Sequence, residues 1–251
     1  LSPPIKVLSR SNSTSVIVAV LVMVHSNSAE IEIGELFGLS ESHLVPIPET
    51  GMMIHARSLA AYTEMQQAAA EQGIEIQVAS AYRSFQRQLN IWNAKALGER
   101  DCLDDSGNCL DLTRLTDMEA VQAIMRFSAL PGASRHHWGT DMDVYDAAAV
   151  SADYQLQLVA SEYLEGGPFN KLHLWLENNA QEFGFARPYQ IDRAGIAPEA
   201  WHISHHRVAQ RYQSALGLEL LAAQLRSAEL EMKDTVLNNL QYLFERYIQI
   251  T

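Results

Sequence analysis

Cysteine is scarce in this chain: among 251 residues there are two, Cys102 and Cys109, in the segment DCLDDSGNCL. Neither lies beside a histidine, so a structural zinc site built on cysteine thiolates is not expected. The residues DDSGN between the two cysteines are typical of a turn. A disulfide across this turn is sterically reasonable in an oxidising compartment, and two free thiols in the cytosol would give the same pattern.

Basic residues are also few relative to acidic ones. The chain has 18 Lys and Arg against 30 Asp and Glu, which gives a formal net charge of −12 at pH 7. A protein this acidic is repelled by phosphate backbones and by anionic lipid headgroups, so nucleic acid is not an expected partner. A small anionic substrate remains compatible with this charge if a few arginines are focused in one cleft.

Apolar runs are too short for a stable membrane span. The run VIVAVLVMV occupies Val16–Val24, whereas a spanning helix needs about 20 apolar residues. Lys6 and Arg10 precede this run and small residues follow it, which is the order of a secretory signal. Residues 1–30 are therefore interpreted as a signal-like segment, a buried strand or a translated upstream stretch, and the sequence leaves these alternatives open.

The rest of the chain, residues 31–251, is expected to form a single domain. No sequence period of a repeat protein recurs, and no Pro-, Gly- or Ser-rich linker separates two halves. Helices are predicted from apolar periodicity, from N-terminal caps such as Ser84 and the Thr116/Glu119 capping box, and from terminating glycines. Their expected ranges are 55–72, 84–97, 116–130, 169–184, 206–221 and 228–248.

Strands are predicted where apolar and polar residues alternate. The segments are IEIQVAS (residues 74–80), GTDMDVY (139–145) and AWHIS (200–204). In the second segment, Asp141 and Asp143 share one face. Few strands, many helices and no strict alternation of the two indicate an α+β fold, with a small, mostly antiparallel sheet flanked by helices.

The segment SRHHWGTDMDVYD, residues 134–146, concentrates groups that bind metal ions. A hydrolytic zinc site uses three protein ligands and leaves one position for water. His136 and either Asp141 or Asp143 can supply two ligands, and Gly139 permits the bend between them. His137 competes with His136, and the strand period does not separate the two aspartates.

A third ligand is expected from the segment PEAWHIS, which holds Glu199 and His202 three residues apart. If His202 completes the metal shell, Glu199 is close enough to take a proton from the attacking water. Zinc and a neighbouring carboxylate together meet the needs of peptide hydrolysis at neutral pH.

Three segments, SAYRSFQRQ, SRHHWGTDMD and EAWH, follow one another in the order of a known family motif. In them the chain resembles the zinc D-alanyl-D-alanine carboxypeptidases, which include vancomycin-resistance D,D-carboxypeptidases and related L,D-carboxypeptidases and share their fold with the Hedgehog signalling domain. The matched core spans residues 80–204. Each segment alone is a weak signal, but all three in the right order are strong. One departure is Ala200, where many relatives have proline.

The resemblance implies a role for each matching residue. The Zn²⁺ ligands would be His136, Asp143 and His202, and the general base would be Glu199. Arg83 would anchor the terminal carboxylate of the substrate. The residues that line the pocket would be Tyr82, Gln88 and Ser134.

The activity implied by the resemblance is removal of the C-terminal D-alanine from peptidoglycan stem peptides or their precursors, in the bacterial cell envelope or periplasm. A cytoplasmic location is the alternative. The same site would also serve an L,D-carboxypeptidase or a peptidoglycan endopeptidase. A different class of protein, a non-catalytic module that binds zinc or wall peptides, is the remaining alternative. Retention of Glu199 beside a full ligand set disfavours it, because a binding module needs no base.

Overall fold

The computed structural model describes residues 31–105, 107–192 and 195–249, which belong to one compact unit. The predicted signal-like or strand segment, residues 1–30, lies outside the described residues. In the described part, no helix combines the length and apolar character that a membrane crossing requires.

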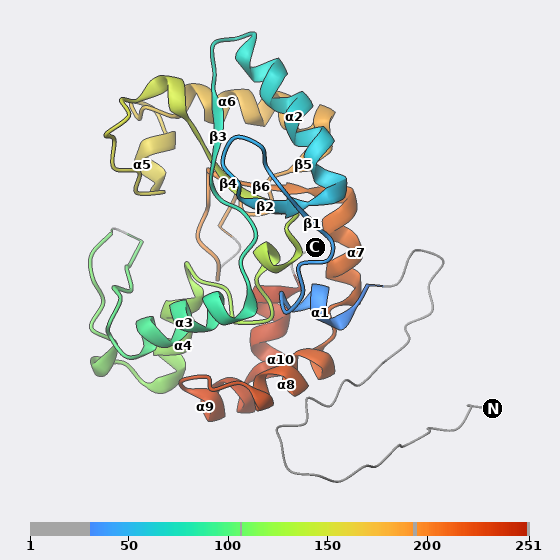
Figure 1. Cartoon of the computed structure of the whole chain (residues 1–251). Coiled ribbons are helices and arrows are strands. Elements are labelled where there is room, and N and C mark those ends of the chain that lie inside the picture. The colour runs from blue at the N-terminus through green and yellow to red at the C-terminus, as the bar shows by residue number, and fades with distance from the viewer. Residues whose placement is uncertain (1–30, 106, 193–194, 250–251) are drawn as a thin grey trace, which may run out of the picture. The chain divides into compact units, whose positions relative to one another are not determined.

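The described strands form two antiparallel sheets (Figure 1). The smaller is a hairpin, and the larger has the strand order β3-β4-β6-β5 with every neighbouring pair antiparallel. This confirms the predicted α+β fold with a small antiparallel sheet. The bounds are β1 (Leu44–Pro46), β2 (Met53–His55), β3 (Ile76–Ser80), β4 (Asp141–Asp146), β5 (Phe185–Ala186) and β6 (His202–His205).

The central helices begin where their sequence caps predict. Ser84 accepts a hydrogen bond from the backbone N–H of Arg87, and Thr116 and Glu119 form the expected capping box. Gly184 ends the helical stretch at residues 170–183 with a left-handed φ of 80°. The helices are α1 (Ile33–Leu36), α2 (Ala56–Ala70), α3 (Phe85–Ala96), α4 (Asp117–Met125), α5 (Ala160–Tyr163), α6 (Asn170–Asn179), α7 (His206–Ala215), α8 (Leu218–Ser227), α9 (Lys233–Asn238) and α10 (Leu240–Leu243).

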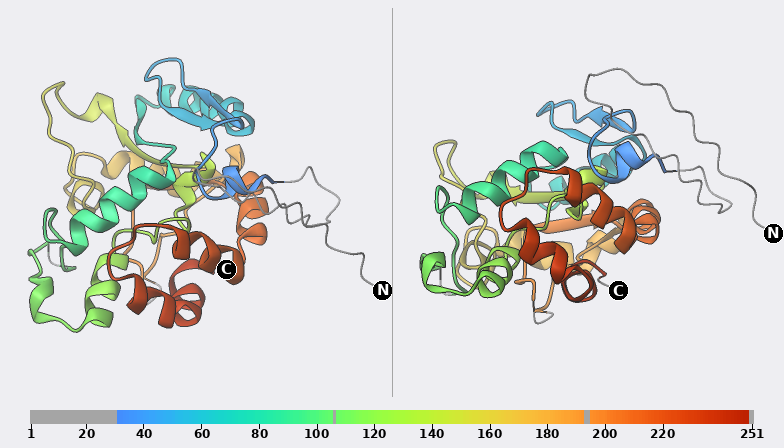
Figure 2. Two further views of the ribbon diagram at one scale, coloured as in Figure 1. Left: turned by 60° about the horizontal axis from the view of Figure 1, so that its bottom comes forward. Right: turned by 90° about the horizontal axis from the view of Figure 1, so that it is seen from below.

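The prediction of two long C-terminal helices is wrong. The range 206–248 instead holds α7 to α10 and a π-helical turn at Phe244–Ile248. Gly217 is extended and starts α8, while Met232 takes a left-handed φ of 60° before α9. These breaks fold the segment back on itself, so its apolar faces pack against α3 and α4 (Figure 2).

The larger sheet separates an apolar face from a polar one. Met142, Val144 and Ile203 are fully buried in a core with α2 and α6. Because side chains alternate along a strand, Asp143 and His202 project from the opposite face. A second core, formed by the helices α3, α4 and α7 to α10, lies apart from the first one. The strand alternation therefore gathers polar side chains on one face of the sheet.

The two cysteines lie on the arms of the predicted turn. Leu103 pairs with Cys109 in an isolated bridge, and the backbone N–H of Leu110 donates to the carbonyl of Cys102. This register puts the cysteines one step apart, on opposite faces of the paired arms. Both are free thiols, Cys102 buried and Cys109 exposed. The arrangement favours the free-thiol alternative over a disulfide.

Candidate metal centre

Three of the predicted site residues come together from three separate elements. His136 lies on a 3-10 helix, Arg135–Trp138, while Asp143 lies on β4 and His202 on β6. The antiparallel register of β4 and β6 places Asp143 directly opposite His202. Gly139 ends the 3-10 helix with a left-handed φ of 66° and packs so tightly that an added Cβ would lie 2.8 Å from the backbone nitrogen of His55. Glycine is therefore required at this bend.

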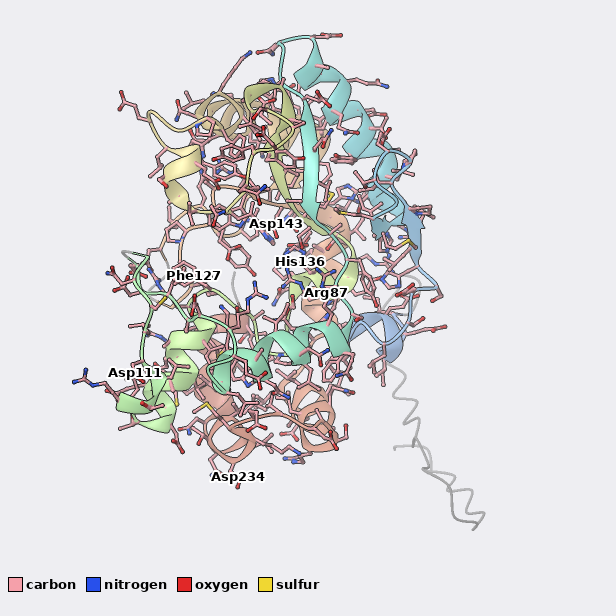
Figure 3. All side chains as sticks on the ribbon, turned by 60° about the vertical axis from the view of Figure 1, so that its left-hand side comes forward. Arg87, Asp111, Phe127, His136, Asp143 and Asp234 are labelled. Atoms are coloured by element: carbon pink, nitrogen blue, oxygen red, sulfur yellow. The ribbon has the colours of Figure 1, made fainter. Side chains whose placement is uncertain are left out.

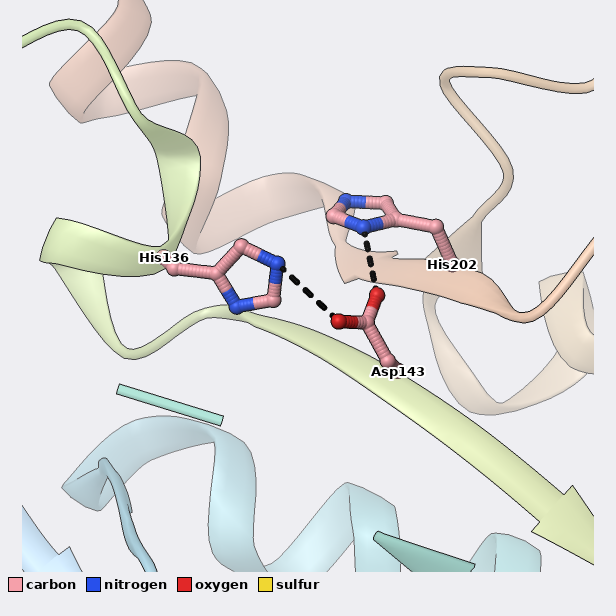
Figure 4. Close-up of side chains that lie close together, drawn as sticks. All are labelled: His136, Asp143 and His202. Atoms are coloured by element: carbon pink, nitrogen blue, oxygen red, sulfur yellow. Dashed lines mark hydrogen bonds and ion pairs between the residues drawn. The ribbon is translucent and has the colours of Figure 1, made fainter. Parts of the chain in front are cut away.

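The donor atoms of this triad converge on one point (Figure 4). His136 Nε2 lies 3.5 Å from Asp143 Oδ2, and His202 Nδ1 lies 3.1 Å from Asp143 Oδ1. One donor atom from each residue lies within 4.8 Å of the others, and all three residues are buried. Zinc binds nitrogen and oxygen ligands at about 2 Å, so a single ion fits among atoms with these separations.

Hydrogen bonds on the far side of each imidazole fix its orientation. His136 Nδ1 lies 2.8 Å from the carbonyl oxygen of Ala81, to which it can only donate, so Nε2 carries the lone pair. His202 Nε2 lies 2.9 Å from Asp141 Oδ1 and leaves Nδ1 facing the triad. Such partners orient metal-binding histidines and increase their basicity.

The charges of the metal-free site are strongly coupled. Burial by itself lowers the pKa of His202, but its hydrogen bonds to Asp141 and Asp143 outweigh burial and raise this pKa to about 10. Burial dominates at His136 and lowers its pKa to about 4. The two carboxylates therefore hold a proton on His202 that a divalent cation must displace.

The sequence left open whether Asp141 or Asp143, and whether His136 or His137, is a metal ligand. Their contacts in the structure distinguish these alternatives. Asp141 contacts the ring nitrogen of His202 that faces away from Asp143, and it also accepts hydrogen bonds from Arg135 Nε at 2.7 Å, Thr140 Oγ1 at 2.7 Å and Ser204 Oγ at 2.9 Å. His137 has both ring nitrogens engaged elsewhere: Nδ1 lies 2.6 Å from the carbonyl of Arg83, and Nε2 accepts from a backbone N–H. Asp143 and His136 remain as the candidate ligands.

Glu199 lies beside the triad without joining it. Its Oε2 is 3.6 Å from His202 Nδ1, and its side chain is 16% exposed. The backbone N–H of Glu199 donates to the carbonyl of Tyr189, which fixes the loop. Burial raises the pKa of Glu199 to about 7 in the metal-free protein, although His202 partly offsets this effect. A carboxylate with such a pKa is suited to proton transfer near neutral pH.

A cavity of about 880 Å³ opens onto the triad and Glu199. His136, Asp143 and Phe127, which are labelled in Figure 3, all line this cavity. Arg83 and Ser134 line this cavity, as the resemblance implied.

The other two predicted pocket residues are absent from this cavity's lining. Gln88 accepts a hydrogen bond from Arg83 Nη1 at 2.8 Å and donates to the carbonyl of Ala129, so it positions the guanidinium. The hydroxyl of Tyr82 donates to the carbonyl of Gly38.

Tyr189 is a cavity residue that sequence reasoning missed. Its ring lies 4.7 Å from the ring of His202, between centroids, and it lines the same cavity. Its neighbours in the sequence, Pro188 and Gln190, belong to no motif. The contact depends on the tertiary position of Tyr189 relative to β6, which local sequence does not reveal.

The chain is similar in sequence to several known proteins. Among curated proteins, an uncharacterised protein of Haemophilus influenzae is 45% identical over 98 residues, which are 38% of this chain and 67% of that protein. A D-alanyl-D-alanine carboxypeptidase of Enterococcus faecalis is 25% identical over 138 residues, covering 54% of this chain and 41% of that protein. A solved structure of a vancomycin-resistance D,D-pentapeptidase VanY mutant with Zn(II) is 24% identical, covers 71% of this chain and 88% of its own, and gives a TM-score of 0.47.

The family comparison covers the whole candidate site. The model of the family described as VanY, D-alanyl-D-alanine carboxypeptidase, matches residues 51–208, more than half of the chain. This range includes Arg83, the triad and Glu199. The protein belongs to the VanY family of D-alanyl-D-alanine carboxypeptidases.

Proposed function

We propose that the protein is a zinc-dependent D-alanyl-D-alanine carboxypeptidase that removes the C-terminal D-alanine from peptidoglycan stem peptides. The observation that carries this proposal is the buried His136, Asp143 and His202 triad with Glu199 beside it, in a chain of this family. A site that only bound wall peptides would have no use for a carboxylate at that position.

The donor set fits zinc. Two imidazoles with fixed tautomers and one carboxylate form a typical ligand set of a catalytic zinc site, which leaves room for water or substrate. When bound, zinc supplies Lewis acidity that polarises a carbonyl and makes water more acidic. His136, Asp143 and His202 would hold the ion.

The chain's own residues supply proton transfer and orientation. Glu199 takes a proton from the attacking water and delivers it to the departing amine, because its carboxylate lies at the triad. Arg83 binds the terminal carboxylate, with its guanidinium held by Gln88 Oε1 at 2.8 Å and Ser80 Oγ at 3.2 Å. A planar guanidinium matches a carboxylate in shape and charge. This contact would restrict cleavage to the end of a chain.

Replacing Arg83 with alanine should lower kcat/KM for peptides with a free C-terminus by about 100-fold, because an anchoring charge is lost. The zinc content should stay the same, since Arg83 is not one of the three converging ligands. Steady-state kinetics and metal analysis of the purified variant would check this. Loss of zinc along with activity would contradict the anchoring role.

Digestion of purified muropeptides tests the proposal directly. Incubation with and without a chelator, read by mass spectrometry, should show chelator-sensitive loss of one alanine from pentapeptides. Loss from tetrapeptides alone would indicate an L,D-carboxypeptidase, and cleavage of cross-linked dimers would indicate an endopeptidase. No cleavage of any substrate would favour a binding module.

A substrate in the cell wall implies an extracytoplasmic location. We therefore infer that the protein acts in the bacterial cell envelope. Fractionation of cells that express the full-length protein would test this inference, and recovery in the cytoplasmic fraction alone would instead favour action on wall precursors.

A further inference from the structure

A second cation of the cavity has no assigned role. Lys95 lies on α3, one helical turn after Ile91, and both residues line the cavity. Lys95 is only 8% exposed. Within the described part of the chain, no hydrogen bond or ion pair engages its ammonium, in contrast to the guanidinium of Arg83. An ammonium that faces a cavity from a largely buried side chain, without an anionic partner, suggests an anionic ligand.

The surroundings of Lys95 contain charges of both signs. Arg83 and Arg100 line the same cavity, and both lower the pKa of Lys95, after burial itself. Cys102 and, to a smaller extent, Glu199 raise the pKa of Lys95, but among the described residues neither forms a hydrogen bond or ion pair with its ammonium. Three further cations, Arg83, Arg100 and Arg135, and five carboxylates line the same cavity, and among the described residues none of these carboxylates forms an ion pair with Lys95.

The acidic residues of the adjoining loop are engaged with other groups. Asp105 binds Arg126 at 2.6 Å, and Asp104 accepts hydrogen bonds from Asn108. Asp101 interacts with the thiol of Cys109. None of these contacts neutralises the ammonium of Lys95.

We propose that Lys95 binds a second anionic group of the substrate, so that the enzyme prefers peptides with another carboxylate besides the terminal one. The proposal rests on the proposed function and narrows its substrate class to acidic peptides. Arg83 and Lys95 line one continuous cavity, so a short peptide can contact both.

Two matched pairs of peptides test this proposal. In the first pair, acetyl-Glu-D-Ala-D-Ala and acetyl-Gln-D-Ala-D-Ala differ in charge before the cleaved bond. In the second, the departing residue is D-Glu or D-Gln. We expect kcat/KM to favour the acidic member of at least one pair by about tenfold, the effect of one charge-assisted hydrogen bond. In Lys95→Gln, which keeps a polar chain of similar reach, this ratio should fall to about one.

Arg87→Gln is the matched control. Arg87 lies on the same helix and carries the same charge, but it is exposed and does not line the cavity. Loss of the Arg87 charge should leave the ratio of kcat/KM between acidic and neutral peptides near its native value. This result would separate a local contact of Lys95 from a general electrostatic effect of the positive charge on α3. Using ratios within each variant removes any general loss of activity or stability.

Equilibrium binding separates this proposal from the proposed function. Calorimetric Kd values for the same peptides, measured in a Glu199→Gln background with and without Lys95→Gln, do not depend on turnover. A preference for acidic peptides that disappears with Lys95 supports the proposal even if no peptide is cleaved. Cleavage without any charge preference, or a preference that persists in Lys95→Gln, would overturn it and leave the carboxypeptidase function intact.

Discussion

Replacing Glu199 with glutamine is expected to lower kcat about 1000-fold, within the range that a positioned general base contributes. Glutamine keeps the shape of the side chain but cannot take a proton from water. The backbone hydrogen bond to Tyr189 does not depend on the side chain, so the loop geometry should persist. Steady-state kinetics on a D-Ala-D-Ala peptide would measure the loss.

The same variant should also lose a pH dependence. Burial raises the pKa of Glu199 to about 7 in the metal-free protein, and a bound cation favours the carboxylate and moves this pKa lower. The native protein should therefore lose activity as the pH falls below neutral, because Glu199 becomes protonated. Glu199→Gln should lack this acidic limb.

Metal content and a control variant decide whether the loss is specific. Glu199→Gln should retain its zinc, because the three converging ligands are untouched. Glu177 lies on α6, pairs with Arg187 and does not line the cavity, so Glu177→Gln should keep the native kcat. Near-native turnover in Glu199→Gln, or loss of zinc from it, would refute the role of Glu199 as the base.

Much of the fold could be predicted because local signals agree with it. The caps at Ser84 and Thr116 begin α3 and α4 as expected, and the alternation in residues 141–144 gives the correct faces of β4. Other elements have weak local signals. The hairpin of β1 and β2 has three residues in each strand, and one of them is Pro46, which is unusual within strands.

The breaks among the C-terminal helices could be predicted only in part. Gly217, at the start of α8, is a visible signal, but methionine is a good helix former and Met232 gives no warning of its left-handed backbone. Met232 packs against the core that contains α3 and α4, a tertiary contact that the local sequence does not show.

The candidate site could be predicted as a set of residues, but not as an arrangement. Nothing local separates Asp141 from Asp143, because both lie on the same face of one strand. The register with β6 separates them: Asp143 faces His202 and Asp141 faces Ser204. Lys95 was also missed, since a lysine on a helix is usually solvated, and only the tertiary structure shows it inside a cavity.

Asp141→Asn is expected to weaken both the fold and the metal site. Asp141 is fully buried and accepts hydrogen bonds from Arg135, Thr140 and Ser204, while it also orients His202. Removing its charge leaves the Arg135 guanidinium, only 12% exposed, without an anionic partner. Breaking a buried pair in this way costs about 3–5 kcal/mol of unfolding free energy, and losing the partner of a metal-binding histidine costs about 10–100-fold in metal affinity.

The contribution of Asp141 to the free energy of unfolding should be fully present at neutral pH. Burial alone would raise its pKa, but Arg135 and the hydrogen bond from His202 outweigh burial and hold this pKa well below its usual range. A lowered carboxyl pKa stabilises the fold above the unfolded-state value of about 3.9, and this stabilisation is lost as the pH falls below it. Denaturant unfolding of the metal-free protein at pH 7 and at pH 3 should therefore show a smaller difference between native and variant at the lower pH.

Asp105→Asn supplies the matched control, because it also removes a carboxylate from an Asp–Arg pair. Asp105 is 64% exposed, and its partner Arg126 keeps a second contact with Asp192. An exposed pair contributes about 0–1 kcal/mol, so this variant should unfold near the native midpoint and bind zinc with native affinity. Equal losses in the two variants would mean that burial of Arg135 is not the cause. Zinc affinity that is unchanged in Asp141→Asn would show that His202 needs no orienting carboxylate, and would remove the physical reason for placing Asp141 behind the triad.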